Sequence, residues 1–132
     1  MSNEPQEATI ASIKHLAENN SEVDVLWLYG SRARGNAQHN SDYDLAIAFT
    51  QYIKDPVERR LRPELLALEW NKLIGASLSI VDINEAPLPL AYAIVQDNMV
   101  IYNQNNYRRM TEEQIIMSKW ELDHLYHRRH YA

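Results

Sequence analysis

One apolar segment constrains the fold more than any other feature of the sequence. Residues Val23–Tyr29 are almost all β-branched, aliphatic or aromatic, with Asp24 as the single charged residue, and Gly30 follows them. A strand with one exposed face would alternate apolar and polar side chains, so this run is typical of a strand covered on both faces. We therefore predict a central strand over these residues.

A second strand is predicted over Tyr43–Phe49, where large apolar residues alternate with small or acidic ones. Because side chains alternate between the two faces of a strand, the large residues share one face, which can pack against helices. The other face carries Asp42, Asp44, Ala46 and Ala48. We expect that face to stay open, with both acids on it.

Helical spacing and turn residues predict the remaining elements. Helices are expected over residues 6–19, from Pro56 to Gly75, and over residues 87–96 and 107–128, with strands over residues 78–83 and 99–102. In the helix that begins at Pro56, Pro63 is expected to kink or restart the helix. The leucines of this helix are expected to face the core: Leu61, Leu65, Leu68 and Leu73.

The order of these elements, α-β-β-α-β-α-β-α, predicts the fold class. It implies an α/β (α+β) fold, with a mixed β-sheet of about four strands and helices packed mainly on one face. The chain has 132 residues, of which 45% are hydrophobic and 23% charged, as in an average globular protein. Residues 1–132 are therefore predicted to form a single domain.

Charge and composition exclude several classes of protein. The net charge of −5 leaves no positive field over the whole molecule, so direct nucleic-acid binding is not expected. The absence of cysteine excludes disulfides, thiolate zinc sites and a cysteine nucleophile. No apolar run approaches the roughly 18 residues of a membrane span, and Met1–Pro5 lacks the features of a signal peptide. We expect a cytoplasmic protein without membrane association.

Asp42 and Asp44 are the polar pair that says most about function. Two carboxylates on one strand face repel each other unless a cation neutralises them. Hard oxygen ligands that leave coordination positions free suit Mg²⁺ together with nucleotide phosphates. The pair therefore predicts a magnesium site. The alternative is an ordinary one, because an Asp-x-Asp segment taken alone is more often solvated or a helix cap.

Gly30 and Ser31 begin a turn at the end of the central strand. The next residues, Arg32–Arg34, are predicted to form the first turn of a short helix, whose free N–H groups would point at an anion. Gly30 allows the close approach of a phosphate and Ser31 adds a hydroxyl donor. Gly35 ends the turn and lets the chain change direction for its return. The glycine spacing also matches a P-loop, but Asn36-Ala37 stands where that loop needs Lys and Ser/Thr.

Together, these segments resemble a known family. Gly30-Ser31, ten further residues and Asp42-Tyr43-Asp44 are similar to the G-S-x10-D-x-D motif of the polymerase β-like nucleotidyltransferases, in their minimal, antitoxin-type branch. The resemblance covers most of the chain, because Asn84–Pro87 and Met99–Tyr102 look like the family's closing segments. It implies a nucleotidyltransferase fold.

The resemblance also implies roles for single residues. Asp42 and Asp44 would be catalytic residues that hold two Mg²⁺ ions. Gly30, Ser31 and Arg32 would bind the triphosphate of the substrate ATP.

The family takes a third carboxylate from the strand after the long helix, and Asp82 is the only acid in Leu78–Ile83. We assign Asp82 as the third metal ligand. With Asn84–Pro87 as the reference segment, the family's acid falls nearer Ser79, which points to the opposite strand face, so that a β-bulge would be needed to reconcile the two. Alternatively, Asp82 caps the loop toward Pro87.

Other residues are expected to be structural or to contact a partner. The C-terminal histidines are interpreted as a solvated or partner-facing helix end rather than as metal ligands: His124, His127 and His130. The tryptophans are interpreted as packing residues: Trp27, Trp70 and Trp120. The basic cluster on the long helix is interpreted as a solvated face, with a partner contact as the alternative: Arg59, Arg60 and Arg62.

Three functions fit these observations. The resemblance implies an enzyme that transfers AMP from ATP to a tyrosine hydroxyl of a cognate HEPN ribonuclease toxin and so neutralises the toxin. The first alternative is an antitoxin that acts by binding and occlusion alone, with the aromatic and basic C-terminal segment as its contact surface. The second is free-standing nucleotidyl transfer to a small molecule or an RNA end. A chain with no second recognition domain is expected to receive its acceptor on a partner protein.

Overall fold

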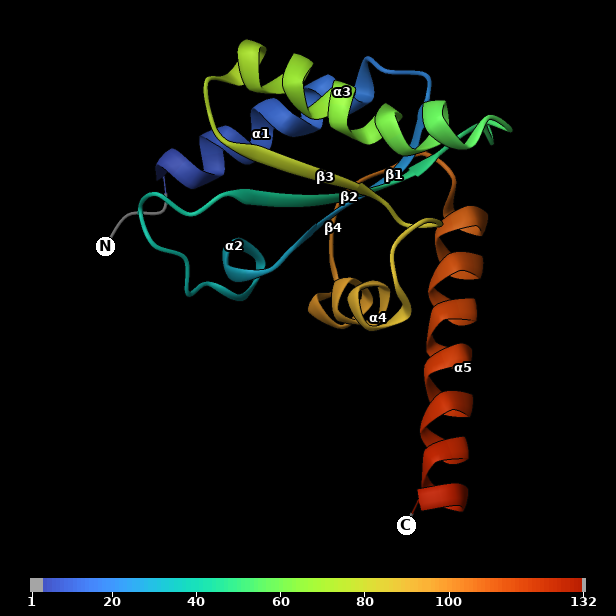
Figure 1. Cartoon of the computed structure of the whole chain (residues 1–132). Coiled ribbons are helices and arrows are strands. Elements are labelled where there is room, and N and C mark those ends of the chain that lie inside the picture. Colours follow the sequence, from blue (N-terminus) through green and yellow to red (C-terminus); the bar gives the residue numbers. More distant parts are fainter. Residues whose placement is uncertain (1–3, 132) are drawn as a thin grey trace.

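The computed structural model describes residues 4–131, with side chains over residues 5–128 (Figure 1). The chain forms these elements in order: α1 (Glu4–Glu18), β1 (Val23–Tyr29), α2 (Ser31–Arg34), β2 (Tyr43–Phe49), α3 (Pro56–Ile74), β3 (Leu78–Asp82), α4 (Leu88–Asp97), β4 (Met99–Asn103) and α5 (Asn106–Tyr131). The two strands predicted as β1 and β2 have the predicted bounds. The other elements lie within a few residues of their predicted positions.

The four strands form one mixed sheet in the order β3-β2-β1-β4. Strand β1 is antiparallel to both of its neighbours, β2 and β4, whereas β2 and β3 are parallel. The central position of β1 explains its apolar sequence, because a strand between two neighbours and under helices has no face in contact with water. The predicted fold class is confirmed.

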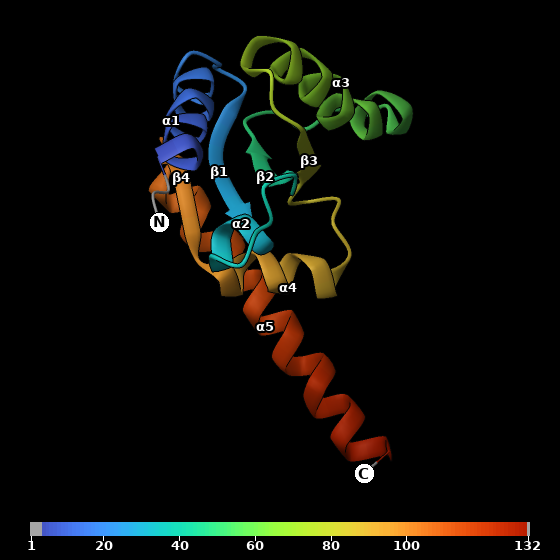
Figure 2. The ribbon, with the colours of Figure 1, turned by 90° about the vertical axis from the view of Figure 1, so that its left-hand side faces the viewer.

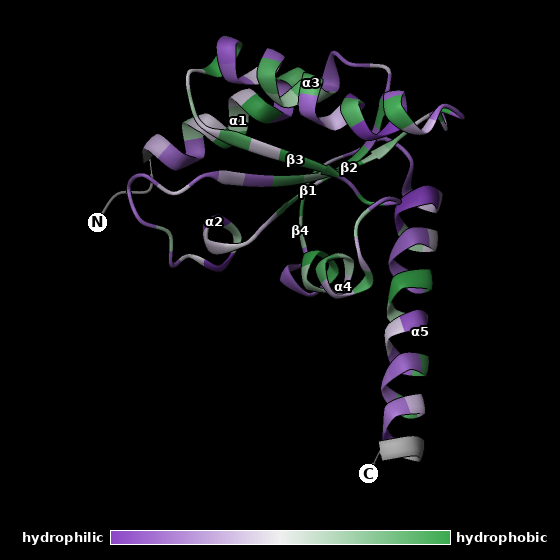
Figure 3. Cartoon of the chain, in the orientation of Figure 1, coloured by the Kyte–Doolittle hydropathy of each residue, from purple (hydrophilic) through white to green (hydrophobic). Residues whose placement is uncertain are grey.

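Different helices cover the two faces of the sheet, as Figures 1 and 2 show. Helices α1 and α3 enclose the larger core, to which β1 contributes Leu26 and Leu28 and β2 contributes Leu45 and Ile47. Helix α4 and the beginning of α5 cover part of the opposite face. In Figure 3 the hydrophobic residues concentrate along the strands between these helix layers.

The face of β2 that carries the acids is open only at its beginning. Ala46 and Ala48 are fully buried and pack in a second core with Ala91 and Ile94 of α4. The expectation that this face stays open is therefore wrong for its second half. The small alanine side chains leave room for α4 to approach the sheet.

The leucines of α3 lie on the side of the helix away from the sheet, contrary to prediction. Their exposed fractions are 39% for Leu61, 60% for Leu65, 58% for Leu68 and 64% for Leu73. The buried side instead consists of Pro63, Leu66, Ala67 and Trp70. Both sets have helical spacing, and the set that includes the tryptophan packs on the sheet because its large ring buries more apolar surface than a leucine. Helix α3 runs through Pro63 without interruption, so this proline does not restart it.

Helix α5 divides into a packed part and a projecting part. Near its beginning, Ile116 is buried and the carboxylate of Glu113 accepts a hydrogen bond of 3.0 Å from Trp27 Nε1. The ring of Trp120 then stacks on Tyr92 of α4 with 4.3 Å between centroids. Beyond that point residues 121–128 are exposed and the helix extends away from the sheet (Figures 1 and 2). Within the described part of the chain, none of the helices combines the length and the apolar character that a membrane crossing requires.

Candidate active site

The turn after β1 has a backbone conformation that requires glycine. Gly30 has φ 79° and ψ −156°, which side chains other than hydrogen rarely allow. Its carbonyl oxygen accepts hydrogen bonds from the amides of Ala33 and Arg34, at 3.1 and 3.0 Å, which form the single helical turn α2. The first amides of α2 have no carbonyl one turn earlier within the helix, so they remain available to an external acceptor.

The Asp44 carboxylate lies directly against this turn. Strands β1 and β2 pair so that Tyr29 stands opposite Asp44. A Cβ atom at Gly30 would lie only 2.7 Å from Asp44 Oδ2. The glycine of the turn and the second aspartate of the motif, fourteen positions apart in the sequence, are therefore adjacent in space.

The electrostatics of the pair favour a bound cation. Burial raises the pKa of the Asp44 carboxyl above its usual range, and the neighbouring Asp42 raises it further. Burial and Asp44 together raise the pKa of Tyr29 to about 12, so the phenol stays neutral. Asp42 is exposed and Asp44 half-buried, so both are open to solvent. Two oxygen donors in an uncompensated negative field suit Mg²⁺.

The Arg32 side chain is bonded to the loop that precedes Asp42 and to α1. Its guanidinium donates four hydrogen bonds, two of them to the carbonyl of Ser41 at 2.8 and 3.2 Å and one to Gln6 of α1 at 3.1 Å. It also lies over the ring of Tyr43, 4.3 Å from the centroid. The side chain thus holds the loop that leads into Asp42, which leaves the backbone amide as the part of Arg32 that faces an anion.

Asp82 is not brought together with the two site aspartates. Its partner in the parallel β2–β3 register is Ile47, which packs in the core under α1 and α3. Asp82 is 5% exposed, and its Oδ2 lies 3.6 Å from Arg62 Nη2 of α3. Because it lies on the opposite sheet face from Asp44, its assignment as third metal ligand is not supported. Its Oδ1 accepts the amide of Asn84 at 2.9 Å, as in the capping alternative.

Ser79 stands where a third carboxylate could have joined the pair. It is the register partner of Asp44 on β3 and is exposed. The pairing over Leu78–Asp82 is regular, without the bulge that could have turned Asp82 to this face. Among the residues that the structure describes, no three His, Asp or Glu side chains form a group able to hold a metal ion. The protein donor set seen here is therefore the two aspartates.

The remaining candidate residues lie outside the candidate active site. Trp27 is fully buried and Trp70 is 2% exposed, so they pack as predicted. Arg59 pairs with Glu85 at 2.7 Å, and Arg62 lies 3.9 Å from the Phe49 ring centroid, so only Arg60 of the basic cluster matches the predicted solvated face. The histidines His124 and His127 are exposed on α5, and the side chain of His130 lies outside the described residues.

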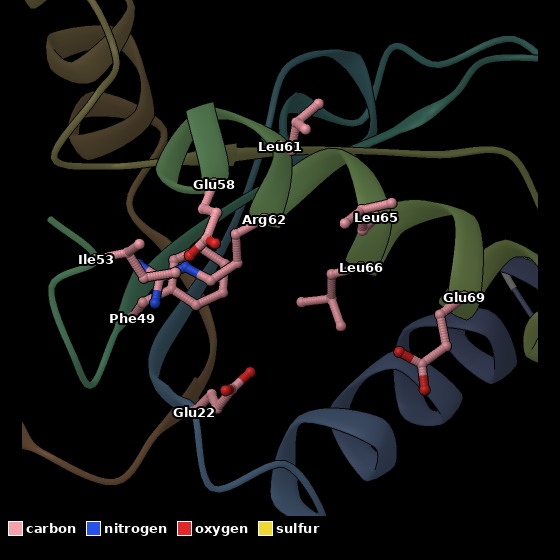
Figure 4. A pocket seen from close by; sticks show the side chains of 9 residues that line it. All are labelled: Glu22, Phe49, Ile53, Glu58, Leu61, Arg62, Leu65, Leu66 and Glu69. Carbon is pink, nitrogen blue, oxygen red and sulfur yellow. The ribbon is translucent and has the colours of Figure 1, made fainter. Parts of the chain in front are cut away.

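A hollow on the opposite side of the sheet contains none of the predicted site residues (Figure 4). It lies between α3 and the end of β2, and its lining includes Phe49, Ile53, Leu61 and Leu65. The candidate active site, at the end of β1 and the beginning of β2, is thus separate from this hollow.

One residue of the site was missed by sequence reasoning. Asp97, at the end of α4, accepts a hydrogen bond of 2.8 Å from the Gly30 amide and lies 3.6 Å from Arg34 of α2. The sequence carries a weak signal for it, because an acid is unfavourable in the last turn of a helix.

A mixed four-stranded sheet, with two aspartates at the beginning of one strand against a Gly-Ser turn on its antiparallel neighbour, is the arrangement of the nucleotidyltransferase fold. The chain belongs to the family described as "Polymerase beta, Nucleotidyltransferase", whose model matches residues 11–107.

One individual protein is also similar to this chain in sequence. The chain is 31% identical over 86 residues to the protein adenylyltransferase MntA of Aphanizomenon flos-aquae (strain 2012/KM1/D3), in an alignment that spans 61% of this chain and 57% of that protein. Little more than half of the relative's length is therefore matched.

Two solved structures have the same fold at low sequence identity. A toxin–antitoxin crystal structure with AMP-PNP has a TM-score of 0.68 and 19% identity, with 93% of each chain covered. A complex of a tri-AMPylated HEPN toxin of Shewanella oneidensis with its MNT antitoxin has a TM-score of 0.67 and 15% identity, with 94% of this chain and 93% of that chain covered.

Proposed function

We propose that this chain is an antitoxin that transfers AMP from ATP to a tyrosine hydroxyl of a cognate HEPN ribonuclease toxin. The observation that carries the proposal is the contact between the turn and the acid pair, in which Asp44 Oδ2 lies 2.7 Å from the Cβ position of Gly30. It brings a phosphate-binding turn and two metal-binding carboxylates within reach of one triphosphate. The identity to MntA supports the choice of a protein acceptor.

In the proposed reaction the acceptor oxygen bonds to the α-phosphorus, the bond from that phosphorus to the β-phosphate oxygen breaks, and pyrophosphate leaves with the two terminal phosphates. The acceptor proton passes to solvent. Mg²⁺ held by Asp42 and Asp44 would supply charge neutralisation on the phosphates and lower the pKa of the acceptor hydroxyl. The amides of Ser31 and Arg32 at the beginning of α2, together with the Ser31 hydroxyl, would hold the phosphates in line.

The test is the mass of the toxin after incubation with this protein, ATP and Mg²⁺. We expect an increment of one or more AMP units on a tyrosine-containing peptide, and none with Asp44→Asn. An unmodified toxin, under conditions in which the two proteins form a complex, would contradict transfer.

A second function, neutralisation by binding alone, is favoured by one observation. Ser79, not an acid, stands beside Asp44, so the metal site has fewer carboxylates than the three expected from the family resemblance. If occlusion is sufficient, Asp44→Asn must suppress the toxin's ribonuclease activity as well as the unchanged protein does. If transfer is required, the variant must leave the ribonuclease active.

A further inference from the structure

Asp97 has a largely enclosed carboxylate whose position is not explained by the stability of its own helix. Only 10% of its side chain is exposed. It is the last residue of α4, where the helix dipole is negative and an acid is unfavourable. Desolvation of a carboxylate adds a further penalty. Something outside α4 must therefore compensate for it.

The compensating partners both belong to the turn that carries the phosphate-binding groups. Asp97 Oδ2 accepts the Gly30 amide hydrogen at 2.8 Å. The same oxygen lies 3.6 Å from Nη1 of Arg34, the last residue of α2. A single carboxylate thus attaches both the beginning and the end of the turn to α4.

Asp97 itself has a rigid location. Asn98 ends α4 in the left-handed conformation, with φ 50°, and β4 begins at the next residue. Met99 pairs there with Leu28, two residues before Gly30. The carboxylate is therefore fixed relative to the end of β1.

Gly30 is consequently held between two carboxylates with different roles. Asp44 lies on the side where a Cβ would stand, and Asp97 holds the amide. The ligands Asp42 and Asp44 belong to the β2 segment and do not depend on Asp97, whose bonds are to the turn. Loss of Asp97 would free the turn to rotate while the acid pair stays in place.

We propose that Asp97 is a positioning residue that orients the Gly30–Ser31 turn for nucleotide phosphates. The part of this inference that concerns the nucleotide rests on the proposed function. The part that concerns the orientation of the turn is independent of it.

The experiment compares Asp97→Ala and Asp97→Asn in the full chain. We expect Asp97→Ala to weaken ATP binding in the presence of Mg²⁺ by about tenfold, the scale of one hydrogen bond to a charged group. The Mg²⁺ concentration that gives half-maximal toxin modification at saturating ATP should not change. Asp97→Asn keeps an oxygen acceptor for the Gly30 amide and should restore most of the affinity.

A nucleotide-independent readout is the exchange of the Gly30 amide proton, measured by NMR. Exchange should accelerate by about tenfold or more in Asp97→Ala and far less in Asp97→Asn. The matched control is Gln96→Ala, an exposed residue one position earlier, which should change neither exchange nor ATP affinity.

Unchanged Gly30 exchange in Asp97→Ala would overturn the inference. So would equal ATP affinity of Asp97→Ala and the unchanged protein, or an Asn variant no better than the Ala variant. A large fall in melting temperature in both variants, with loss of all binding, would indicate a purely structural role and would also overturn it. If the unchanged protein neither binds ATP nor modifies the toxin, the proposed function fails, and the exchange measurement still decides the role of Asp97.

Discussion

At the site, the ionisation of the Asp44 carboxyl group makes the stability of the fold depend on pH. Burial and Asp42 raise its pKa in the folded protein above the ordinary value of 3.8. A raised pKa means that the folded state favours the protonated form. The stability this confers is fully present below pH 3.8 and is lost as the pH rises through the folded pKa. At neutral pH the ionised Asp44 therefore destabilises the fold.

We predict that Asp44→Asn abolishes AMP transfer and leaves the melting temperature at pH 7 equal or higher. The advantage of the variant should shrink as the pH is lowered toward 4. Thermal unfolding of both proteins between pH 7 and pH 4 measures this, and Mg²⁺ should raise the melting temperature of the unchanged protein alone. A variant that is less stable at pH 7, or that still transfers AMP, would contradict the assignment.

The Gly30–Ser31 turn allows nucleotide and metal binding to be separated. We predict that Ser31→Ala weakens ATP binding but not Mg²⁺ binding, because only a hydroxyl donor to phosphate is lost. Gly30→Val should weaken both, because a side chain there meets Asp44 Oδ2 at 2.7 Å and must adopt φ 79°. Calorimetric titration with ATP and with Mg²⁺ tests this. Equal Mg²⁺ affinity in the two variants would show that a side chain at position 30 does not displace the Asp44 carboxylate.

At the scale of elements, helix α3 has two apolar sides, and only one of them packs against the sheet. Leu66 is 8% exposed and Leu65 is 60% exposed, although they are neighbours in the sequence. The outward leucines leave an apolar strip on the helix surface, and the inward residues close the core over β3.

We predict that Leu66→Ala lowers the free energy of unfolding by roughly 2–5 kcal/mol, because it leaves a cavity in the core. Leu65→Ala should change it by less than about 0.5 kcal/mol. Urea denaturation of the two variants, each compared with the unchanged protein, measures the difference. Similar losses in both would mean that α3 is rotated relative to the structure described here.

At the scale of the whole molecule, the projecting end of α5 is the surface most available to a partner. Leu122 and Leu125 are 67% and 54% exposed on a helix that has left the sheet. Isolated helical segments of this length are marginal in water, so a partner that covers the apolar side would stabilise it. The active-site turn and this segment lie in different parts of the fold (Figure 2).

We therefore predict that a chain truncated after Trp120 no longer forms a stable complex with the proposed toxin but still binds ATP and Mg²⁺. Retention of Trp120 preserves the stack on Tyr92 and so the packed part of α5. Size-exclusion chromatography of the mixed proteins and calorimetry with ATP measure the two properties. If the truncated protein still binds and modifies the toxin, docking uses another surface, and α3 with Arg60 and its outward leucines is the next candidate.

The sequence alone was sufficient for properties that depend on near neighbours along the chain. The strands at Val23–Tyr29 and Tyr43–Phe49 follow from side-chain alternation and from the glycine that ends the first strand. The proximity of Asp42 to Asp44 follows from their spacing in the sequence. The same local order led to the family, because Gly30-Ser31 and the acid pair have a characteristic spacing.

Only the tertiary structure decided which element each ambiguous side chain meets. Asp82 pairs with Ile47 and turns to α3, Leu65 turns to solvent, and Asp97 reaches a turn 67 positions away. In each case the local pattern allows two arrangements, and long-range packing and charge pairing select one of them. Such contacts are set by the relative positions of whole elements, which the periodicity within a single segment does not contain.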